Sequence, residues 1–416
     1  MKDKRTILLA TMGSAGDVYP MLALGRGLQA RGHHPIILTN DHFEALVAEA
    51  GLPFIALGGR EEYQRTMENP DLWNPVRGLG VVAKNGMMPL LRPFYDIVRQ
   101  FDPQTTILAA TVLLFGARIA HEKLGIPLVS IHLQPSLFRS VFAPPNLGGF
   151  RLPDWMPHRL KRGYFRLLDA AFIDPLMAKE TNAFRAEVGL PPVTRLFDQW
   201  MFSPQKNIGL FPDWFAAPQP DWPPNTQLTG FIQHEQPQGM TADLRTFLDE
   251  GEPPIVFTPG TAMQHGADFF RESVAAVQKL GRRAILLTQH TGQVPPNLPP
   301  TVRHFRYVPL QELLPHSAAL VYHGGVGTLA QALAAGIPHL VIPFSHDQPD
   351  NAQRLRHMGV GDFLPPKQYK ASAVAAKLNH LLTHPATQQR CAALAQQVDF
   401  EQALEASCAA ITAVGG

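Results

Sequence analysis

The sequence predicts an α/β fold built from two Rossmann-like domains, because two distant segments each show a buried strand, a glycine-containing turn and a helix. The first has an apolar strand at residues 6–11, a helix at 21–30 and a second strand at 35–39. The other has a strand at 318–322, an alanine-rich helix at 329–335 and a strand at 337–344. A chain of 416 residues suits two domains of roughly 200 residues each.

A composition shift marks the predicted domain boundary. Strand and helix patterns alternate through residues 1–211, which we assign to an N-terminal domain. Residues 212–240 are rich in Pro, Gln and Trp and are expected to form a linker. A C-terminal domain is predicted at 241–399, followed by a final helix at 400–416.

Composition excludes several classes of protein. A net charge of +2 is too small to indicate nucleic-acid binding. The two cysteines, Cys391 and Cys408, make no disulfide framework, which fits a reducing compartment. The charged start of the chain leads into only a brief apolar strand, and no 18-residue apolar run follows. We therefore expect a cytoplasmic protein.

A glycine-rich turn between a predicted strand and helix has the chemistry of a phosphate site. Residues 323–328 read His-Gly-Gly-Val-Gly-Thr. The first N–H groups of a helix lack partners and carry partial positive charge, which attracts phosphate. The three glycines let a bulky anion approach the backbone, and His323 and Thr328 can each add a donor.

A carboxylate and an amide follow the next predicted strand. Asp347 and Gln348 lie just past its C-terminal end, the edge of an open α/β sheet where ligands bind. Asp can accept from two vicinal hydroxyls, whereas Gln both donates and accepts. This pair therefore suits a polyhydroxylated ring, although a solvated loop is the plain alternative.

These residues resemble the donor-binding signature of inverting GT-B glycosyltransferases of the plant and bacterial family 1 type. The resemblance implies that Tyr307 stacks on the nucleobase, that His323 and its glycine turn hold the diphosphate, and that Asp347 and Gln348 contact the sugar. A loop at 258–261 resembles the part that touches the diphosphate. The implied donor-binding residues are Ser14, Gly260, Thr261, Tyr307, Val308, His323, Gly324, Gly325, Val326, Gly327, Thr328, Gln331, Asp347 and Gln348. Gln331 stands where the family often has a ribose-contacting Glu, which leaves both dTDP and UDP open.

The loop after the first predicted strand carries the candidate base. A dinucleotide-binding enzyme would show G-x-G-x-x-G here, but Gly13 and Gly16 leave a two-residue gap with Asp17 behind them. From the residues alone, Asp17 could simply cap a helix beginning near Tyr19. The family resemblance instead implies that Asp17 is the general base.

The resemblance also implies an overall architecture and a mechanism. GT-B enzymes have two Rossmann-like domains facing each other across a ligand cleft, and their last helix usually returns to the first domain. An inverting transfer needs one base and one stabiliser of the leaving group. Because no Asp-x-Asp triplet occurs in the sequence, we expect neither a metal nor any other cofactor, with a nucleotide sugar as co-substrate.

The acceptor region is expected between residues 134 and 202, which are dense in aromatic residues and prolines. Phe138, Phe142 and Trp155 are the candidate acceptor-binding residues, because such a composition suits an apolar pocket. The segment 155–179 sets basic residues beside aromatic ones. It is interpreted either as an ordinary amphipathic helix or as a helix lying on an anionic membrane surface, and hence as a peripheral inner-membrane contact.

Longer runs resemble the bacterial rhamnosyltransferases that form mono-rhamnolipids. These runs are residues 63–67, 71–73, 116–123, 199–205 and 211–215. The resemblance implies transfer of rhamnose from dTDP-L-rhamnose to a hydroxyacyloxy-alkanoate lipid. Three alternatives stay open: a UDP-glucose-dependent enzyme acting on a sterol, terpenoid, polyketide or flavonoid; a non-catalytic nucleotide-sugar-binding partner protein; and a nucleotide-sugar epimerase.

Overall fold

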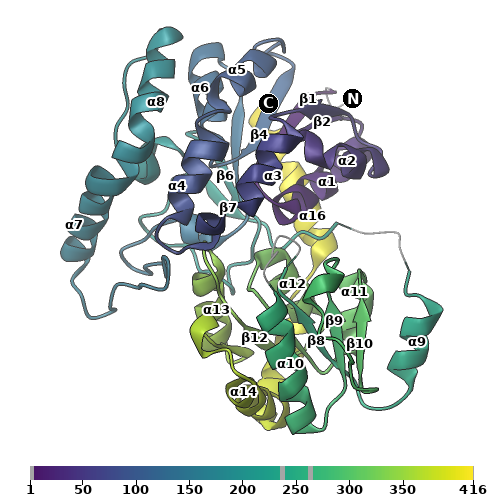
Figure 1. The fold of residues 1–416 in the computed structure, drawn as a ribbon. Helices are drawn as coiled ribbons and strands as arrows, with labels where there is room; N and C mark the ends of the chain where they lie inside the picture. Colours follow the sequence, from purple (N-terminus) through teal and green to yellow (C-terminus); the bar gives the residue numbers. More distant parts are fainter. Residues whose placement is uncertain (1–3, 235–238, 261–265, 416) are drawn as a thin grey trace. The chain divides into compact units, whose positions relative to one another are not determined.

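The structure is a computed structural model that describes residues 4–234, 239–260 and 266–415. The chain divides into two compact units, each built on one sheet (Figure 1). Unit 1 comprises residues 1–146, 150–234 and 400–416, and unit 2 comprises residues 147–149 and 235–399.

The sheet of unit 1 has the order β3-β2-β1-β4-β5-β6-β7, and all its neighbouring strands are parallel. Its strands are β1 (Thr6–Ala10), β2 (His34–Thr39), β3 (Phe54–Ala56), β4 (Thr106–Thr111), β5 (Leu128–His132), β6 (Lys206–Gly209) and β7 (Thr226–Leu228). Its helices are α1 (Ala15–Ala30), α2 (Glu44–Glu49), α3 (Arg60–Glu68), α4 (Gly78–Val82), α5 (Leu91–Val98), α6 (Phe115–Leu124), α7 (His158–Leu168), α8 (Asp174–Glu187) and α16 (Phe400–Thr412). The strand order reverses between β1 and β4, so the loops after these two strands leave the sheet in opposite directions.

Unit 2 repeats this plan, with the parallel order β10-β9-β8-β11-β12-β13 and a reversal between β8 and β11. Its strands are β8 (Ile255–Thr258), β9 (Ala284–Leu287), β10 (Val302–Phe305), β11 (Ala319–Tyr322), β12 (His339–Val341) and β13 (Gly361–Phe363). Its helices are α9 (Ala242–Asp249), α10 (Ala267–Leu280), α11 (Leu310–Leu313), α12 (Val326–Ala334), α13 (Gln348–His357), α14 (Ala371–Thr383) and α15 (Pro385–Ala395).

The central strands are buried because helices cover both faces of a parallel sheet. All six residues of β4 are buried, and so are all four of β9 and all four of β11. This explains why these strands are continuous apolar runs in the sequence rather than alternating ones. The predicted α/β class is confirmed by two all-parallel sheets with helices between most successive strands.

Two elements differ from the sequence-based expectation. The first helix begins at Ala15 rather than at residue 21, because Ser14 caps it and Pro20 is accommodated inside it. Proline in a helix usually signals a boundary, which is why the pattern pointed to a later start. The expected linker at 212–240 contains β7, whose Thr226–Leu228 pairs with β6 and extends the first sheet. Three residues among prolines are too short a strand signal to detect by pattern.

The last helix packs on the first. A Cβ on Gly27 of α1 would lie 2.9 Å from Cys408 Sγ, so only glycine allows this approach of α16. Ser407 Oγ donates to Thr229 Oγ1 at 2.7 Å, just after β7. Gly230 has φ of +103°, and a Cβ on it would lie 2.8 Å from the Cβ of Ala403 in α16. Helix α16 is thereby joined to both α1 and the edge of the sheet in unit 1.

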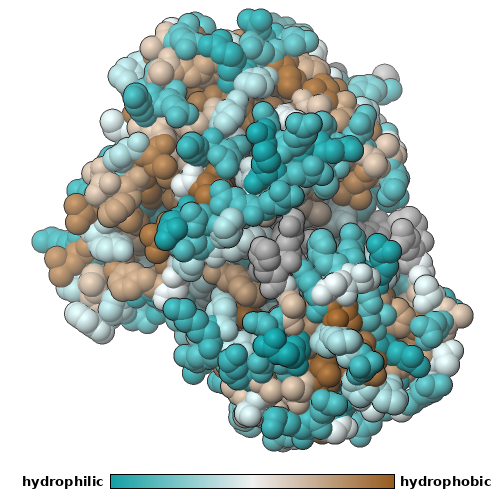
Figure 2. Space-filling view, in the orientation of Figure 1, coloured by the Kyte–Doolittle hydropathy of each residue, from teal (hydrophilic) through white to brown (hydrophobic). Residues whose placement is uncertain are grey.

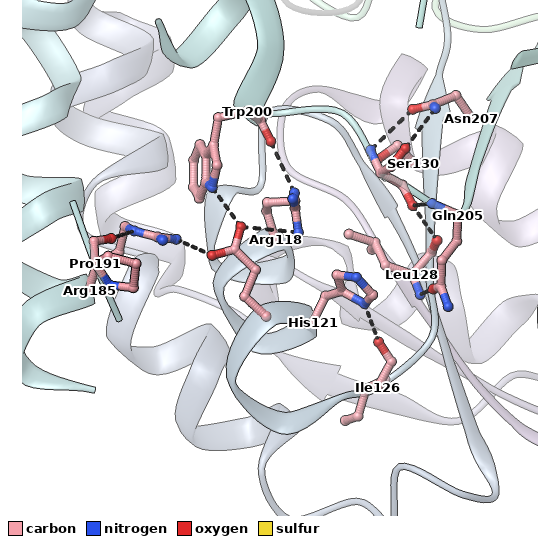
Figure 3. A network of polar contacts seen from close by, with 12 residues as sticks. Arg118, His121, Ile126, Leu128, Ser130, Arg185, Pro191, Trp200, Gln205 and Asn207 are labelled. Atoms are coloured by element: carbon pink, nitrogen blue, oxygen red, sulfur yellow. Dashed lines mark hydrogen bonds and ion pairs between the residues drawn. The ribbon is translucent and has the colours of Figure 1, made fainter. Parts of the chain in front are cut away.

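A buried ionic network joins α6 to α8 and to a π-helical turn, η6 (Leu196–Trp200), in unit 1 (Figure 3). One oxygen of Glu122 accepts from Arg185 at 2.6 Å, and the other accepts from Trp200 Nε1 at 2.8 Å. Arg118 pairs with the same carboxylate and donates to the Trp200 carbonyl. Arg185 is almost completely buried, so its charge depends on this carboxylate for compensation.

Replacing Glu122 by Ala should lower the free energy of unfolding by about 3–5 kcal/mol, because two guanidinium groups would lose their carboxylate. Denaturation in urea would measure the change. Arg271→Ala is the control, since the Arg271 side chain is exposed and its pairs with Asp268 and Glu272 should contribute about 0–1 kcal/mol. Equal effects of the two substitutions would show that the network does not hold unit 1 together.

Candidate functional site

Asp17 lies in the loop and first helical turn that follow β1, at the strand-order reversal of unit 1. Its Oδ2 accepts from the Ser14 N–H at 2.7 Å and from the Ser14 hydroxyl at 3.1 Å. Gly13 has φ of +121°, and a Cβ there would collide with the Asp17 carboxylate. Ser14 and Asp17 therefore form a capping box whose tight turn needs a glycine.

The environment of Asp17 suits a proton acceptor. Burial raises the pKa of its carboxyl from 3.8 to about 6, against the opposing effect of the Ser14 hydrogen bonds. Part of the residue nevertheless remains exposed to solvent. Asp17 is thus ionised at neutral pH while retaining a higher affinity for a proton than an exposed aspartate. Capping and acid–base chemistry are compatible here, since the cap occupies Oδ2.

Sequence reasoning did not select Tyr63 of α3, which lies close to Asp17. Burial, followed by the negative charge of Asp17, raises the pKa of the Tyr63 hydroxyl. Its ring stacks on His42 with centroids 4.6 Å apart and meets the edge of Phe43 at 5.3 Å. The run at 63–67 was a usable signal, but nothing in the linear sequence links it to residue 17.

In unit 2, the turn after β11 forms a helix N-terminus whose N–H groups are available to a ligand. The first bond inside α12 runs from the Leu329 N–H to the Gly325 carbonyl at 3.0 Å. The N–H groups of Val326, Gly327 and Thr328 therefore have no partner within the helix. Gly324 has φ of +98°, and a Cβ on it would lie 2.7 Å from Val341. A helix N-terminus carries partial positive charge, and the phosphate site at this turn stays a prediction.

His323 lies close to Gly325 of this turn and to Gly260 of the loop after β8. A Cβ on Gly325 would lie 2.5 Å from its Nε2, and a Cβ on Gly260 would lie 2.9 Å from its Nδ1. Nδ1 is buried and has no hydrogen-bond partner among the described residues. Burial lowers the pKa of His323 to about 4, so the ring is neutral at physiological pH and carries one N–H. Such a ring can donate to a phosphate oxygen without bringing a charge.

Asp347 and Gln348 open α13, after β12. The turn before them places His346 at φ of +58°. The Oε1 atom of Gln348 accepts from the backbone N–H groups of Phe344 and Ser345, so this side chain supports the turn before α13. Asn351, four residues after Asp347, donates to Asp347 Oδ2 at 2.7 Å and to the Gly324 carbonyl at 2.9 Å. The sequence pattern did not indicate Asn351. Its two hydrogen bonds connect Asp347 to the glycine turn that follows β11.

The remaining predicted donor residues vary in exposure. Tyr307 is 40% exposed, whereas Val308 beside it is buried. Gln331 is half-buried in α12. Gly260 closes on His323, but Thr261 lies outside the described residues.

The predicted acceptor residues do not lie in one environment. Phe138 is 2% exposed and stacks with Trp222, at 4.7 Å between centroids, and with Phe202, so its ring belongs to the core. Phe142 and Trp155 are exposed. An aromatic-rich stretch does not distinguish core rings from surface rings, which is why the sequence grouped these three.

The part of the chain that the structure describes has neither a metal-binding cluster nor a membrane-spanning helix. Within residues 4–234, 239–260 and 266–415, no group of three or more His, Cys, Asp or Glu side chains could hold a metal ion. Across the same ranges, no helix combines the length and the apolar character that crossing a membrane requires.

Two known family models match separate parts of the chain. Residues 7–143 match the glycosyltransferase family 28 N-terminal domain. Residues 272–407 match the C-terminal domain described as erythromycin biosynthesis protein CIII-like. The two matches contain the Asp17 loop and the His323 turn, respectively.

Relatives are similar over nearly the whole chain. The O-mycaminosyltylonolide 6-deoxyallosyltransferase of Streptomyces fradiae is 29% identical, over 97% of this chain and 96% of its own length. A vancomycin aglycone glucosyltransferase of Amycolatopsis orientalis is 28% identical, over 85% and 84%. Among solved structures, the kitacinnamycin glycosyltransferase superposes with a TM-score of 0.73 at 20% identity, covering 99% of this chain and 100% of its own.

The two parallel-sheet units and these structural neighbours define the GT-B class of fold. The protein is a glycosyltransferase, and it is similar to enzymes named for antibiotic biosynthesis. The more specific resemblance to a rhamnolipid-forming enzyme is not among the names that these comparisons give.

Asp17→Asn should stabilise the protein at alkaline pH. With a pKa raised from 3.8 to about 6, the folded state holds a proton that the unfolded chain releases, and the resulting stability is lost as the pH rises through 6. Removing the charge should therefore raise the free energy of unfolding by about 1–2 kcal/mol at pH 8 and by little near pH 4. Urea denaturation at both pH values measures this. A loss of stability at pH 8 would mean that the Ser14 bonds outweigh burial.

Gly325→Ala should displace the His323 ring, because the new Cβ would lie 2.5 Å from Nε2. We expect altered imidazole NMR signals in the ligand-free protein and at least about tenfold weaker nucleotide diphosphate binding. Gly327→Ala is the matched control, since its Cβ meets nothing within 4 Å and should leave the His323 signals unchanged. Displacement of the ring with unaltered nucleotide affinity would remove His323 from the binding site.

Proposed function

We propose that this protein is an inverting glycosyltransferase that moves a hexose from a nucleotide sugar to a hydroxyl group of a hydrophobic acceptor, without a metal. The observation that carries the proposal is the Asp17 carboxylate, fixed by Ser14 at the strand-order reversal with a pKa of about 6. A base with this pKa can take a hydroxyl proton near neutral pH. Its presence with the His323 turn favours an active enzyme over a non-catalytic partner protein.

The proposed reaction assigns one role to each unit. The acceptor oxygen bonds to the anomeric carbon while its proton passes to Asp17 in unit 1. The bond from the anomeric carbon to the phosphate oxygen breaks, and the nucleoside diphosphate leaves. Negative charge then develops on the diphosphate, where the His323 N–H and the first N–H groups of α12 in unit 2 would stabilise it.

For the donor, we favour dTDP-L-rhamnose over UDP-glucose. Support comes from a relative named as a 6-deoxyallosyltransferase and from a spinosyn rhamnosyltransferase solved with thymidine diphosphate, which has a TM-score of 0.66 at 18% identity over 94% of this chain and 96% of its own. Gln331 in place of the family's frequent Glu fits a nucleotide whose ribose lacks a 2′-hydroxyl. The vancomycin aglycone glucosyltransferase supports the second candidate, glucosylation of a polyketide, sterol, terpenoid or flavonoid.

For the acceptor, we favour a hydroxyacyloxy-alkanoate lipid. The support is the resemblance of several runs in unit 1 to the rhamnolipid-forming enzymes. The polyketide-type names of the relatives support the alternative acceptors.

Calorimetric titration with dTDP, UDP and their rhamnose and glucose conjugates, with no added metal, tests the donor assignment. Turnover of the preferred donor with lipid and aglycone acceptors then tests the acceptor. Asp17→Asn should lower kcat by about 10²–10⁴-fold while nucleotide affinity changes little, because the base acts in the transition state. For the native enzyme, kcat/KM should fall about tenfold per pH unit below pH 6.

Unchanged turnover in Asp17→Asn would remove this residue from the mechanism. Loss of activity on adding a chelator would contradict the metal-free reaction. Preferential binding of UDP-glucose would replace the rhamnose assignment, and failure to bind any nucleotide sugar would contradict the role given to the His323 turn.

A further inference from the structure

Exposed apolar side chains are concentrated around one helix of unit 1. Of the ten large hydrophobic residues that are exposed within the described ranges, eight fall between residues 142 and 176. Trp155 is 81% exposed, Leu167 66% and Phe172 68%. Figure 2 shows hydrophobic residues gathered over the position of α7, at the left of the view. Scattered apolar residues need no explanation, but such a cluster does.

The helical spacing separates a buried row of α7 side chains from an exposed apolar row. In α7, Lys161 and Phe165 are buried, and Phe165 packs in a small cluster with Val141 and Leu152. Leu160, Tyr164 and Leu167 recur at i, i+4 and i+7 and make a second apolar row that is exposed. Together with Trp155 and Phe172, this row is the apolar face of α7. The buried row packs against unit 1, whereas this face has large apolar side chains exposed.

A basic row runs along the same helix. Arg159, Arg162 and Arg166 recur at i, i+3 and i+7, and all three are exposed. No acidic residue occurs between His158 and Leu168. The two nearest acids are already engaged, because Asp154 accepts twice from Arg151 and the buried Asp169 accepts twice from Arg139. The electrostatic field around the apolar face is therefore positive.

We propose that the apolar face of α7 and its arginine row dock the protein on the surface of an anionic lipid bilayer. A helix with one row of Trp, Tyr and Leu side chains and another of arginine lies in the interfacial plane of such a membrane. The apolar row enters the acyl boundary while the arginines reach lipid phosphates. Self-association through this face would bring two arginine rows together without acidic partners, which disfavours a second copy as the occupant.

This docking surface is distinct from the sugar-transfer chemistry. It lies on α7 and its flanks, and it uses neither Asp17 nor any residue assigned to nucleotide binding. The docking proposal does not depend on which sugar is transferred. If the protein does not bind vesicles, the glycosyltransferase assignment is unaffected.

Co-sedimentation of the full chain with vesicles tests the proposal. We expect binding to vesicles that contain phosphatidylglycerol, little binding to phosphatidylcholine alone, and weakening with salt. The triple substitution Arg159→Glu, Arg162→Glu and Arg166→Glu should lower the partition coefficient at least about tenfold. Leu160→Ser with Leu167→Ser should do the same by removing apolar area.

Matched controls distinguish this face from general effects. Arg245→Glu, Lys279→Glu and Lys367→Glu make the same change of charge at exposed positions of unit 2 and should change binding less than about twofold. Val76→Ser, at a residue 89% exposed elsewhere in unit 1, is the apolar control. Circular dichroism and nucleotide titration check that each variant is folded.

Three outcomes would overturn the proposal. The first is no binding of the native protein to anionic vesicles at low salt. The second is equal loss of binding in the test and control variants. The third is native self-association that the α7 substitutions abolish, without vesicle binding, which would identify the face as an interface between copies of this chain.

Discussion

Reversal of strand order within an all-parallel sheet is the constraint on which both candidate sites depend. Parallel strands place all their carboxyl ends at one edge, and adjacent loops diverge only where the order reverses. In unit 1 this point lies between β1 and β4, and Asp17 follows β1. In unit 2 it lies between β8 and β11, and Gly260 and His323 follow those two strands. The same topology thus places the candidate base of unit 1 and the candidate anion site of unit 2 at equivalent points of their sheets.

Glycine residues allow close approach of the backbone at both candidate sites. Gly13, Gly324 and Gly325 each stand where a Cβ would strike a functional side chain or a strand. Gly13 and Gly324 also have positive φ angles, so both the backbone conformation and the close contact require glycine at these positions. Two of the candidate site residues also stabilise the local backbone. Asp17 caps α1 with one oxygen, and Gln348 supports its own loop with Oε1.

The sequence predicted features that depend on local pattern. Alternation of strands and helices indicated the two sheets, and the glycine turn before Thr328 indicated a helix N-terminus. It did not predict β7 or the early start of α1, because a three-residue strand and a proline inside a helix run against pattern rules. Tyr63 and Asn351 were missed because their importance comes from tertiary contacts. The runs at 116–123 and 199–205 contain Arg118, Glu122 and Trp200 of the ionic network and the contacts of Ser203 with β5, so both runs contribute to the packing of unit 1.

The placement of α16 has a consequence for synthesis of the chain on the ribosome. Residues 400–412 emerge after all of unit 2, yet they cover the Gly27 surface of α1, the helix that begins beside Asp17. Unit 1 is thus interrupted by unit 2 and completed last, although its sheet strands are made first. Until α16 arrives, α1 exposes an apolar surface in the nascent chain, where chaperones act. Unit 2, whose strands and helices are nearly contiguous in sequence, can fold while unit 1 waits for its final helix.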